Sequence, residues 1–184
     1  MLAIVPFKGL DGGKTRLAAV LSSAERARVA VEMLERVLVA CEGAASIART
    51  LLVTPDPSLR DLHSEILVDA GTGHADAVAL ALADPRAREG AIVVMADCPL
   101  ATSDALDALT EAAQPLSLVA ARDGGVNALA LRDPSLFAPV FGVPAAETVA
   151  RARAAGIEPV LVDDERLSLD VDRPEDYELA VARL

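Results

Sequence analysis

The segment AIVVMADCPL, which spans residues 91–100, decides the fold. Its first five residues, AIVVM, form the strongest strand signal in the chain, because a short apolar run with β-branched side chains is typical of a buried strand. Asp97 follows this run, and Pro99 marks the turn after it. Ligands of open α/β sheets bind at the carboxyl ends of the strands. Polar residues that follow such apolar runs are therefore the first candidates for a functional site.

Short apolar runs alternate with helical patterns on both sides of this segment, which predicts an α/β fold with a mostly parallel, Rossmann-like sheet. We expect the other strands at residues 2–5, 51–54, 66–68, 116–121, 127–131 and 159–162. We expect helices at residues 22–41, 75–83, 148–154 and 174–184, and one that begins at Thr102 or Ser103. The close strands near residues 116 and 131 predict a small antiparallel excursion. No repeat or linker divides the sequence, so we expect a single domain over residues 1–184.

Composition and charge exclude several kinds of protein. Hydrophobic residues make up 53% of the chain and aromatic residues only 2%, so Ala, Leu and Val fill the core, as in sheets covered on both faces. The 28 acidic and 17 basic residues give a net charge of −11, which opposes binding to nucleic acid. Cys41 and Cys98 form neither a metal-binding pair nor a disulfide framework, as is typical of a reducing compartment. No apolar run is long enough for a signal peptide or a membrane span, and we expect a cytoplasmic protein with no membrane partner.

The segment VPFKGLDGGKTRL, residues 5–17, combines a strand end, a glycine-rich loop and the start of a helix. It carries three cations, Lys8, Lys14 and Arg16. Backbone N–H groups at a helix N-terminus and fixed cations both suit a triphosphate, so this loop is a candidate phosphate-binding site. Its spacing is not that of a Walker A motif. The alternative is an ordinary glycine-rich turn with solvated cations.

Three carboxylates are candidate ligands of a metal ion. Asp97 follows the strongest strand, and Asp170 and Asp172 are two residues apart, so that their side chains share a face in an extended segment. Carboxylate oxygens suit Mg²⁺, which is usually held by one or two carboxylates together with substrate phosphates. Asp97 can instead cap the turn before Pro99. Asp172 can instead cap the last helix, since Pro174 follows it, whereas Asp170 has no such alternative and is the better metal candidate.

The weaker signals are a short glycine segment, two histidines and a cysteine. The segment GTG at residues 71–73 follows a predicted strand, where it can line the base or ribose of a nucleotide or simply form a loop. His63 and His74 are not near each other or near a cysteine at any metal-ligand spacing, so we interpret both as structural or exposed. Cys98 lies beside Asp97, and a small buried residue explains it better than a nucleophile does.

Three segments, in this order, resemble one family of enzymes. They are VPFK…KTRL at the start of the chain, ADCPL at residues 96–100 and LDVDRPED at residues 169–176. They are similar to the 2-phospho-L-lactate guanylyltransferases, a family that includes the phosphoenolpyruvate guanylyltransferases of coenzyme F-420 biosynthesis. The segments GVNAL at residues 125–129 and FG at residues 141–142 resemble the stretch that binds the acceptor acid in this family. The resemblance spans nearly the whole chain.

This resemblance implies a GT-A-like fold and an enzyme that transfers GMP from GTP to a phosphorylated three-carbon acid, with Mg²⁺ as the cofactor. It implies that the metal is held by Asp97, Asp170 and Asp172. The implied catalytic residues are Lys8, Lys14, Arg16 and Asp97. The implied nucleotide contacts are Pro6, Phe7, Lys8, Gly9, Lys14, Gly71 and Gly73. The implied acceptor contacts are Val126, Asn127, Gly142 and Ala145.

Two segments depart from the family pattern. Residues 73–75 read Gly-His-Ala where the family usually has Gly-Leu-Asn, and residues 141–145 read FGVPA where it usually has FGPGS. Ala145 thus replaces a serine whose hydroxyl would meet the acceptor, and the backbone N–H of Ala145 is the group that remains for this contact. We therefore expect a raised KM for the acceptor, which Ala145→Ser should lower.

Two other functions stay open. One is a nucleotidyltransferase of another pathway, such as the guanylyl- or cytidylyltransferases of the molybdenum cofactor, although this chain lacks their GGxSxRMG opening. The other is a nucleotide-binding module without activity. Besides GTP and the acid, the partners to consider are a second copy of the chain in a homodimer, and the next enzyme of the pathway, which would take the product.

Overall fold

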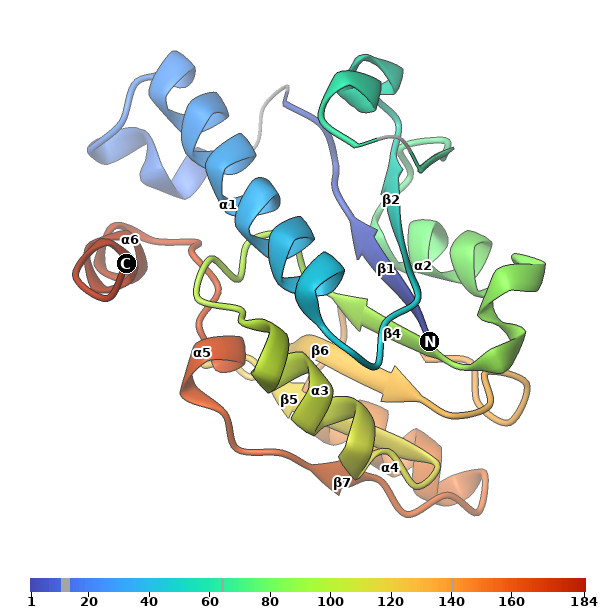
Figure 1. The fold of residues 1–184 in the computed structure, drawn as a ribbon. Coiled ribbons are helices and arrows are strands. Elements are labelled where there is room, and N and C mark those ends of the chain that lie inside the picture. The colour runs from blue at the N-terminus through green and yellow to red at the C-terminus, as the bar shows by residue number, and fades with distance from the viewer. Residues whose placement is uncertain (11–13, 64, 140) are drawn as a thin grey trace.

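The computed structural model describes residues 1–10, 14–63, 65–139 and 141–184, and its strands form one seven-stranded sheet (Figure 1). The strand order is β3-β2-β1-β4-β6-β5-β7. The strands are β1 (Leu2–Pro6), β2 (Arg49–Thr54), β3 (Ile66–Val68), β4 (Ala91–Val94), β5 (Leu116–Ala120), β6 (Val126–Leu131) and β7 (Val160–Leu161). Of the described strands, β6 alone runs antiparallel to its neighbours, β4 and β5. The predicted α/β fold, with a mostly parallel sheet and a small antiparallel excursion, is confirmed.

Helices cover both faces of this sheet. They are α1 (Ser23–Gly43), α2 (His74–Leu82), α3 (Ser103–Ala112), α4 (Ala145–Ala154), α5 (Glu165–Ser168) and α6 (Pro174–Val181), with 3-10 turns η1 (Thr15–Ala19), η2 (Pro57–Asp61) and η3 (Pro85–Glu89). Successive side chains of a strand point to opposite faces. In β1, Ala3 and Val5 belong to the core under α1 and α3, whereas Leu2 and Ile4 belong to the core under α2 and α4. None of the described helices combines the length and the apolar character that crossing a bilayer requires.

The longest helix, α1, begins where the sequence predicts. The backbone N–H of Glu25 donates to Ser22 Oγ at 3.3 Å, and the backbone N–H of Ser22 donates to Glu25 Oε2 at 2.8 Å. This reciprocal pair is the predicted capping box, and it satisfies donors that a helix start otherwise leaves without partners. Because α1 follows the β1 loop along the chain, fixing its first turn also fixes one end of that loop.

The last helix is capped differently from the prediction. Its N-cap is Arg173, and the Asp176 carboxylate accepts the backbone N–H groups of Arg173 at 2.9 Å and Asp172 at 3.3 Å. The interpretation of Asp172 as a helix cap is therefore wrong, because Asp172 lies one residue before the N-cap and its carboxylate pairs with Lys14 and Arg16 instead. The carboxylate of Asp172 is left to point elsewhere.

Candidate active site

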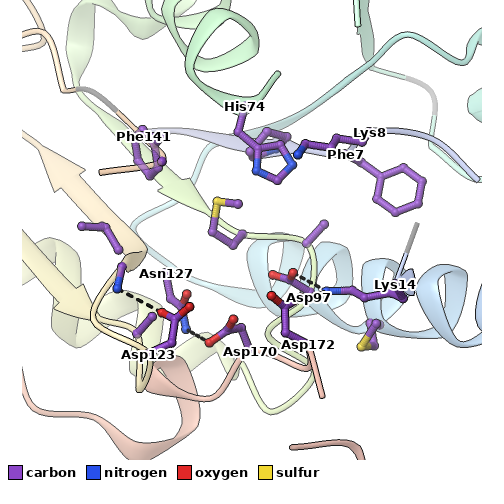
Figure 2. A pocket seen from close by; sticks show the side chains of 18 of the residues that line it. Phe7, Lys8, Lys14, His74, Asp97, Asp123, Asn127, Phe141, Asp170 and Asp172 are labelled. Atoms are coloured by element: carbon purple, nitrogen blue, oxygen red, sulfur yellow. Dashed lines mark hydrogen bonds and ion pairs between the residues drawn. The ribbon is translucent and has the colours of Figure 1, made fainter. Parts of the chain in front are cut away.

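A cavity of about 690 Å³ opens at the carboxyl ends of β1 and β4, the place where α/β sheets bind their ligands. Figure 2 shows side chains entering it from several loops. One side is formed by the loop after β1 (residues 6–9), by Lys14 and by His74 at the start of α2. The other side is formed by residues 123–127 and 141–144.

The three predicted carboxylates lie together in this cavity. Asp97, Asp170 and Asp172 each offer one oxygen, and these oxygens lie within 4.8 Å of one another. The backbone N–H of Val171 donates to the Asp97 carbonyl at 3.0 Å, which holds residues 170–172 against the end of β4. The all-oxygen donor set has the chemistry that Mg²⁺ prefers, so these residues fit that ion.

Lys14 reaches into this carboxylate cluster. Its Nζ lies 2.5 Å from Asp97 Oδ2 and 2.9 Å from Asp172 Oδ1, and its side chain is only 12% exposed. Arg16 Nη1 approaches Asp172 Oδ2 at 3.0 Å from outside the cavity. The backbone of Lys14 is left-handed, with φ 53°, and among the described residues it is the sole non-glycine with positive φ. Such a conformation costs roughly 1–2 kcal/mol, and here it places a cation between two candidate metal ligands.

The pKa values of the residues in this cluster shift in different directions. Burial would lower the pKa of Lys14, but the charges and hydrogen bonds of Asp97 and Asp172 outweigh it and raise that pKa. Burial would raise the pKa of Asp172, but the nearby cations, Lys14 first, hold it below its usual value. Asp170 differs, because burial raises its pKa despite a hydrogen bond from Asn127. No Lys or Arg in the described part of the chain pairs with Asp170, so this carboxylate is the one with most to gain from a bound cation.

The side chain of Asn127, which was predicted to contact the acceptor, donates hydrogen bonds within the protein. It is 4% exposed, and its Nδ2 donates to the carbonyls of Leu167 and Ser168 at 3.1 and 3.0 Å. The same nitrogen lies 3.2 Å from Asp170 Oδ1. Asn127 lines the cavity, but its amide donors position the segment that carries Asp170.

The other predicted residues divide between the cavity and its surroundings. Pro6, Phe7, Lys8 and Gly9 line the cavity, as do Val126 and Gly142. Gly71 and Gly73 line a smaller recess beside it, which Phe7, Lys8 and His74 share. Residues 11–13 of the predicted phosphate loop lie outside the described residues.

Ala145 does not line the cavity. It is 6% exposed and belongs to the core under α4, and its backbone N–H donates to the Gly124 carbonyl at 2.8 Å. The expectation that this N–H remains for the acceptor is therefore wrong. Ala145 is the first residue of α4, whose early N–H groups need acceptors from outside the helix, and Gly124 supplies one.

Among the titratable side chains that line the cavity, sequence reasoning missed two, His74 and Asp123. Asp123 Oδ1 accepts the backbone N–H of Gly125 at 3.0 Å, which shapes the turn before β6. His74 directly follows the glycine segment at 71–73, and that segment was the available signal for it.

The family follows from comparison with known proteins. The family profile described as "Guanylyl transferase CofC like" matches residues 1–181. The chain belongs to this family.

Curated relatives of this CofC-like chain are named for three different acceptor acids. The phosphoenolpyruvate guanylyltransferase of Sphaerobacter thermophilus is 34% identical, with 96% of this chain and 90% of that protein covered. The 3-phospho-D-glycerate guanylyltransferase of Phenylobacterium zucineum is 37% identical, with 95% and 86% covered. The 2-phospho-L-lactate guanylyltransferase of Haloterrigena turkmenica is 36% identical, with 96% and 81% covered.

Solved structures share the fold at low identity. A 4-diphosphocytidyl-2C-methyl-D-erythritol synthase has a TM-score of 0.67 at 17% identity, with 100% of this chain and 97% of that chain covered. A CMP:2-keto-3-deoxy-manno-octonic acid synthetase complexed with CTP has a TM-score of 0.63 at 14% identity, with 100% and 99% covered. At these identities the likeness shows the GT-A-like fold alone.

The remaining histidine and the cysteines of this CofC-like chain have structural explanations. Burial raises the pKa of the Cys98 thiol well above its usual value, and that of Cys41 to about 12. Neither is therefore a thiolate nucleophile. His63 Nε2 lies 2.8 Å from the Thr50 carbonyl and its Nδ1 lies 3.3 Å from Glu42, as expected for a structural histidine.

Proposed function

We propose that this chain is a guanylyltransferase of coenzyme F-420 biosynthesis, which transfers GMP from GTP to a phosphorylated three-carbon acid and releases pyrophosphate. One observation carries this proposal beyond family membership. A cluster of three carboxylates, suited to a divalent cation, shares one cavity with Lys8 and Lys14. Carboxylates for a metal and cations for phosphates are the two requirements of a nucleotidyl-transfer site.

In this proposal, the predicted metal-binding and nucleotide-binding residues act as follows. Asp97, Asp170 and Asp172 would hold Mg²⁺, which would neutralise charge on the triphosphate. Lys8, Lys14 and Arg16 contact phosphates. The nucleoside lies against the loops that hold Pro6, Phe7, Gly9, Gly71 and Gly73.

The reaction needs positioning more than proton transfer. An oxygen of the acceptor phosphate forms a bond to the α-phosphorus of GTP, and the bond from that phosphorus to the oxygen bridging the β-phosphate breaks. The acceptor phosphate is already anionic at neutral pH, so no side chain has to remove a proton from it. Lys14 exchanges its carboxylate partners for phosphate oxygens and offsets the charge that moves onto pyrophosphate.

The acceptor belongs to the class that the three relatives' names share, a three-carbon acid with one phosphate. Val126 and Gly142 line the same cavity as Lys8 and the carboxylates, and they would contact this acid. We retain the expectation of a cytoplasmic enzyme, because free thiols such as Cys41 and Cys98 are typical of that compartment. A homodimer and transfer of the product to the next enzyme of the pathway also stay predictions.

A panel of nucleotides and acceptors tests this function. Pyrophosphate release is measured with GTP, ATP, CTP and UTP, each with phosphoenolpyruvate, 2-phospho-L-lactate or 3-phospho-D-glycerate, at saturating Mg²⁺. We expect release with GTP and at least one of the acids. Release with ATP, CTP or UTP but not with GTP would point to another nucleotidyltransferase pathway. GTP binding without release from any combination would favour the inactive binding module.

A further inference from the structure

His74 stands at the edge of the cavity with its imidazole pointing inward (Figure 2). It is the first residue of α2 and follows Gly73, whose φ of 138° few residues other than glycine adopt. This turn delivers the side chain to the side of the cavity that also carries Lys8. His74 and Lys8 line the same adjoining recess as well, so the two side chains belong to one corner of the site.

In the part of the chain that the structure describes, the imidazole of His74 has no partner that explains its position structurally. Within the described residues no hydrogen bond or ion pair to its ring is found, although the ring is half-buried. The chain's other histidine, His63, engages both ring nitrogens. Buried polar groups normally have partners, so a half-buried ring that faces a cavity without one has its donor and acceptor available for a ligand.

The charges around His74 define what that ligand is. Lys8 and Lys14 act on the ring most strongly among the cations, and Asp97 and Asp172 act on it from the carboxylate cluster. Asp76 on α2 itself is exposed to solvent. An anion that contacts the two lysines therefore lies within reach of the imidazole too, and a polyphosphate is the anion that suits two lysines at once.

We propose that His74 is a further nucleotide-binding residue of this cavity, whose imidazole donates a hydrogen bond to a phosphate of GTP beside Lys8. This inference rests on the proposed guanylyltransferase function and extends it by one residue.

Binding of a phosphate should then be linked to a proton. Burial, followed by the charge of Lys8, lowers the pKa of His74 in the nucleotide-free protein, so the ring is neutral near pH 7. A phosphate anion beside the ring favours the charged form and raises this pKa in the complex. A group whose pKa rises on binding takes up a proton, so the contribution of His74 to GTP affinity grows as the pH falls from about 8 toward 6.

The two histidines of the chain make a direct measurement feasible. Imidazole proton resonances of the wild-type protein are titrated by NMR, with and without GTP and Mg²⁺ and with no acceptor present. We expect the pKa of His74 to rise when GTP binds. His74→Gln assigns the signals. An identical His74 titration in both states, with GTP shown to be bound, would overturn the inference.

Affinity gives a second, independent readout. Calorimetry compares wild-type protein with His74→Gln and with the control His63→Gln at pH 6 and pH 8. For the loss of one charge-assisted hydrogen bond we expect GTP to bind His74→Gln about tenfold more weakly at pH 6, and within about twofold of wild type at pH 8. Protonation of GTP itself cancels in this comparison. If wild-type protein fails to bind GTP, the proposed function fails; if all three proteins bind it equally at both pH values, only the role of His74 fails.

Discussion

The two ends of the cavity differ in charge. The end that takes the nucleotide in the proposed function, here the nucleotide end, carries Lys8, Lys14 and His74. The end proposed for the acid, here the acceptor end, consists of residues 123–127 and 141–144, and these described residues contribute no cationic side chain to the lining. The charged side chain at the acceptor end is Asp123, a carboxylate. An anionic acceptor thus enters a region without a fixed positive charge of its own, in a chain whose net charge is −11.

This difference implies an order of events. Fixed cations can hold the triphosphate before anything else binds, because they already face the cavity. The acceptor, in contrast, needs positive charge that only the carboxylate cluster with a bound cation, or Lys14 released from that cluster, can offer. Under the proposed function, the acceptor end therefore depends on the bound nucleotide and its metal ion for positive charge, whereas Lys8 at the nucleotide end faces the cavity before either substrate binds.

The largest effect is expected at the border between the two ends. Asp97→Asn keeps the shape of the side chain but removes the charge that the end of β4 presents to both substrates. Turnover should fall by roughly 100- to 1,000-fold, with the fold intact. Pyrophosphate release and circular dichroism check this, with the exposed Asp163→Asn as the control. Near-normal turnover of a folded Asp97→Asn protein would remove Asp97 from the site.

Lys14→Met probes the cation that holds the carboxylate cluster together. Without the ammonium group of Lys14, the three carboxylates repel one another. We expect the unfolding free energy to fall by about 2 kcal/mol. Breaking a fully buried ion pair costs ~3–5 kcal/mol, and the loss here is smaller because the side chain of Asp172 is 37% exposed. Mg²⁺ should restore most of this loss, since it replaces the missing cation, while GTP affinity stays reduced. Thermal unfolding with and without Mg²⁺ measures this.

The control for Lys14→Met is Arg28→Met, which removes a cation of α1 that is 71% exposed and pairs with Glu32 on the same helix. That variant should show neither the loss of stability nor the enhanced rescue by Mg²⁺. Equal responses of the two variants would mean that Lys14 does not hold the carboxylate cluster together.

Acceptor binding should depend on the nucleotide. We expect phosphoenolpyruvate, 2-phospho-L-lactate and 3-phospho-D-glycerate to bind the free protein at least tenfold more weakly than the complex with Mg²⁺ and a non-reactive GTP analogue, a difference of about 1.4 kcal/mol or more. Calorimetry in both states checks this. Equal acceptor affinity with and without the nucleotide would show that the acceptor end has a positive potential of its own.

A smaller effect separates the roles of two neighbouring carboxylates. Asp176→Ala removes the acceptor of the Arg173 N–H and should cost about 1 kcal/mol of stability, with little effect on turnover. Asp172→Ala should do the opposite and reduce turnover, because Asp172 pairs with Lys14 and Arg16 and caps nothing. Urea unfolding and kinetics of both variants test this, and an exchange of the two phenotypes would restore Asp172 as the cap.

The sequence was sufficient for the strands and for the carboxylates that follow them. The third strand was predicted at residues 66–68 and lies at Ile66–Val68, because an apolar run between turn signals has few alternatives. The single-turn helix α5 was missed, since so short an element depends on tertiary contacts rather than on periodicity. The resemblance implied that Asp97, Asp170 and Asp172 share a metal ion, and the structure brings their oxygens within 4.8 Å of one another, although residues 170–172 follow helix α5 rather than a strand.

What could not be predicted depends on partners distant in sequence. Asp172 is paired with Lys14, which lies 158 residues away, and no local pattern indicates this. His74 was interpreted as structural or exposed because its spacing fits no metal site, although lining a cavity requires no spacing. Helix α4 begins at Ala145, three residues before the predicted start. The N–H of Ala145 is therefore in the first turn, where it donates to the Gly124 carbonyl.

The smallest expected effects test where the acceptor lies within its end of the cavity. Val126 lines the cavity, and Thr has nearly the same shape as Val, so Val126→Thr adds a hydroxyl donor without repacking. A neutral hydrogen bond of about 1 kcal/mol would lower the acceptor KM by roughly fivefold. Ala145→Ser is the variant that the resemblance to the family favoured for this purpose. Residue 145 is only 6% exposed, and its backbone N–H already donates to the Gly124 carbonyl. The acceptor KM of Ala145→Ser should therefore stay within about twofold of wild type. Steady-state kinetics with the preferred acid at saturating GTP compares the two. If Ala145→Ser lowers the KM and Val126→Thr does not, the acceptor binds against the start of α4 rather than the start of β6, and the assignment of the acceptor end must move with it.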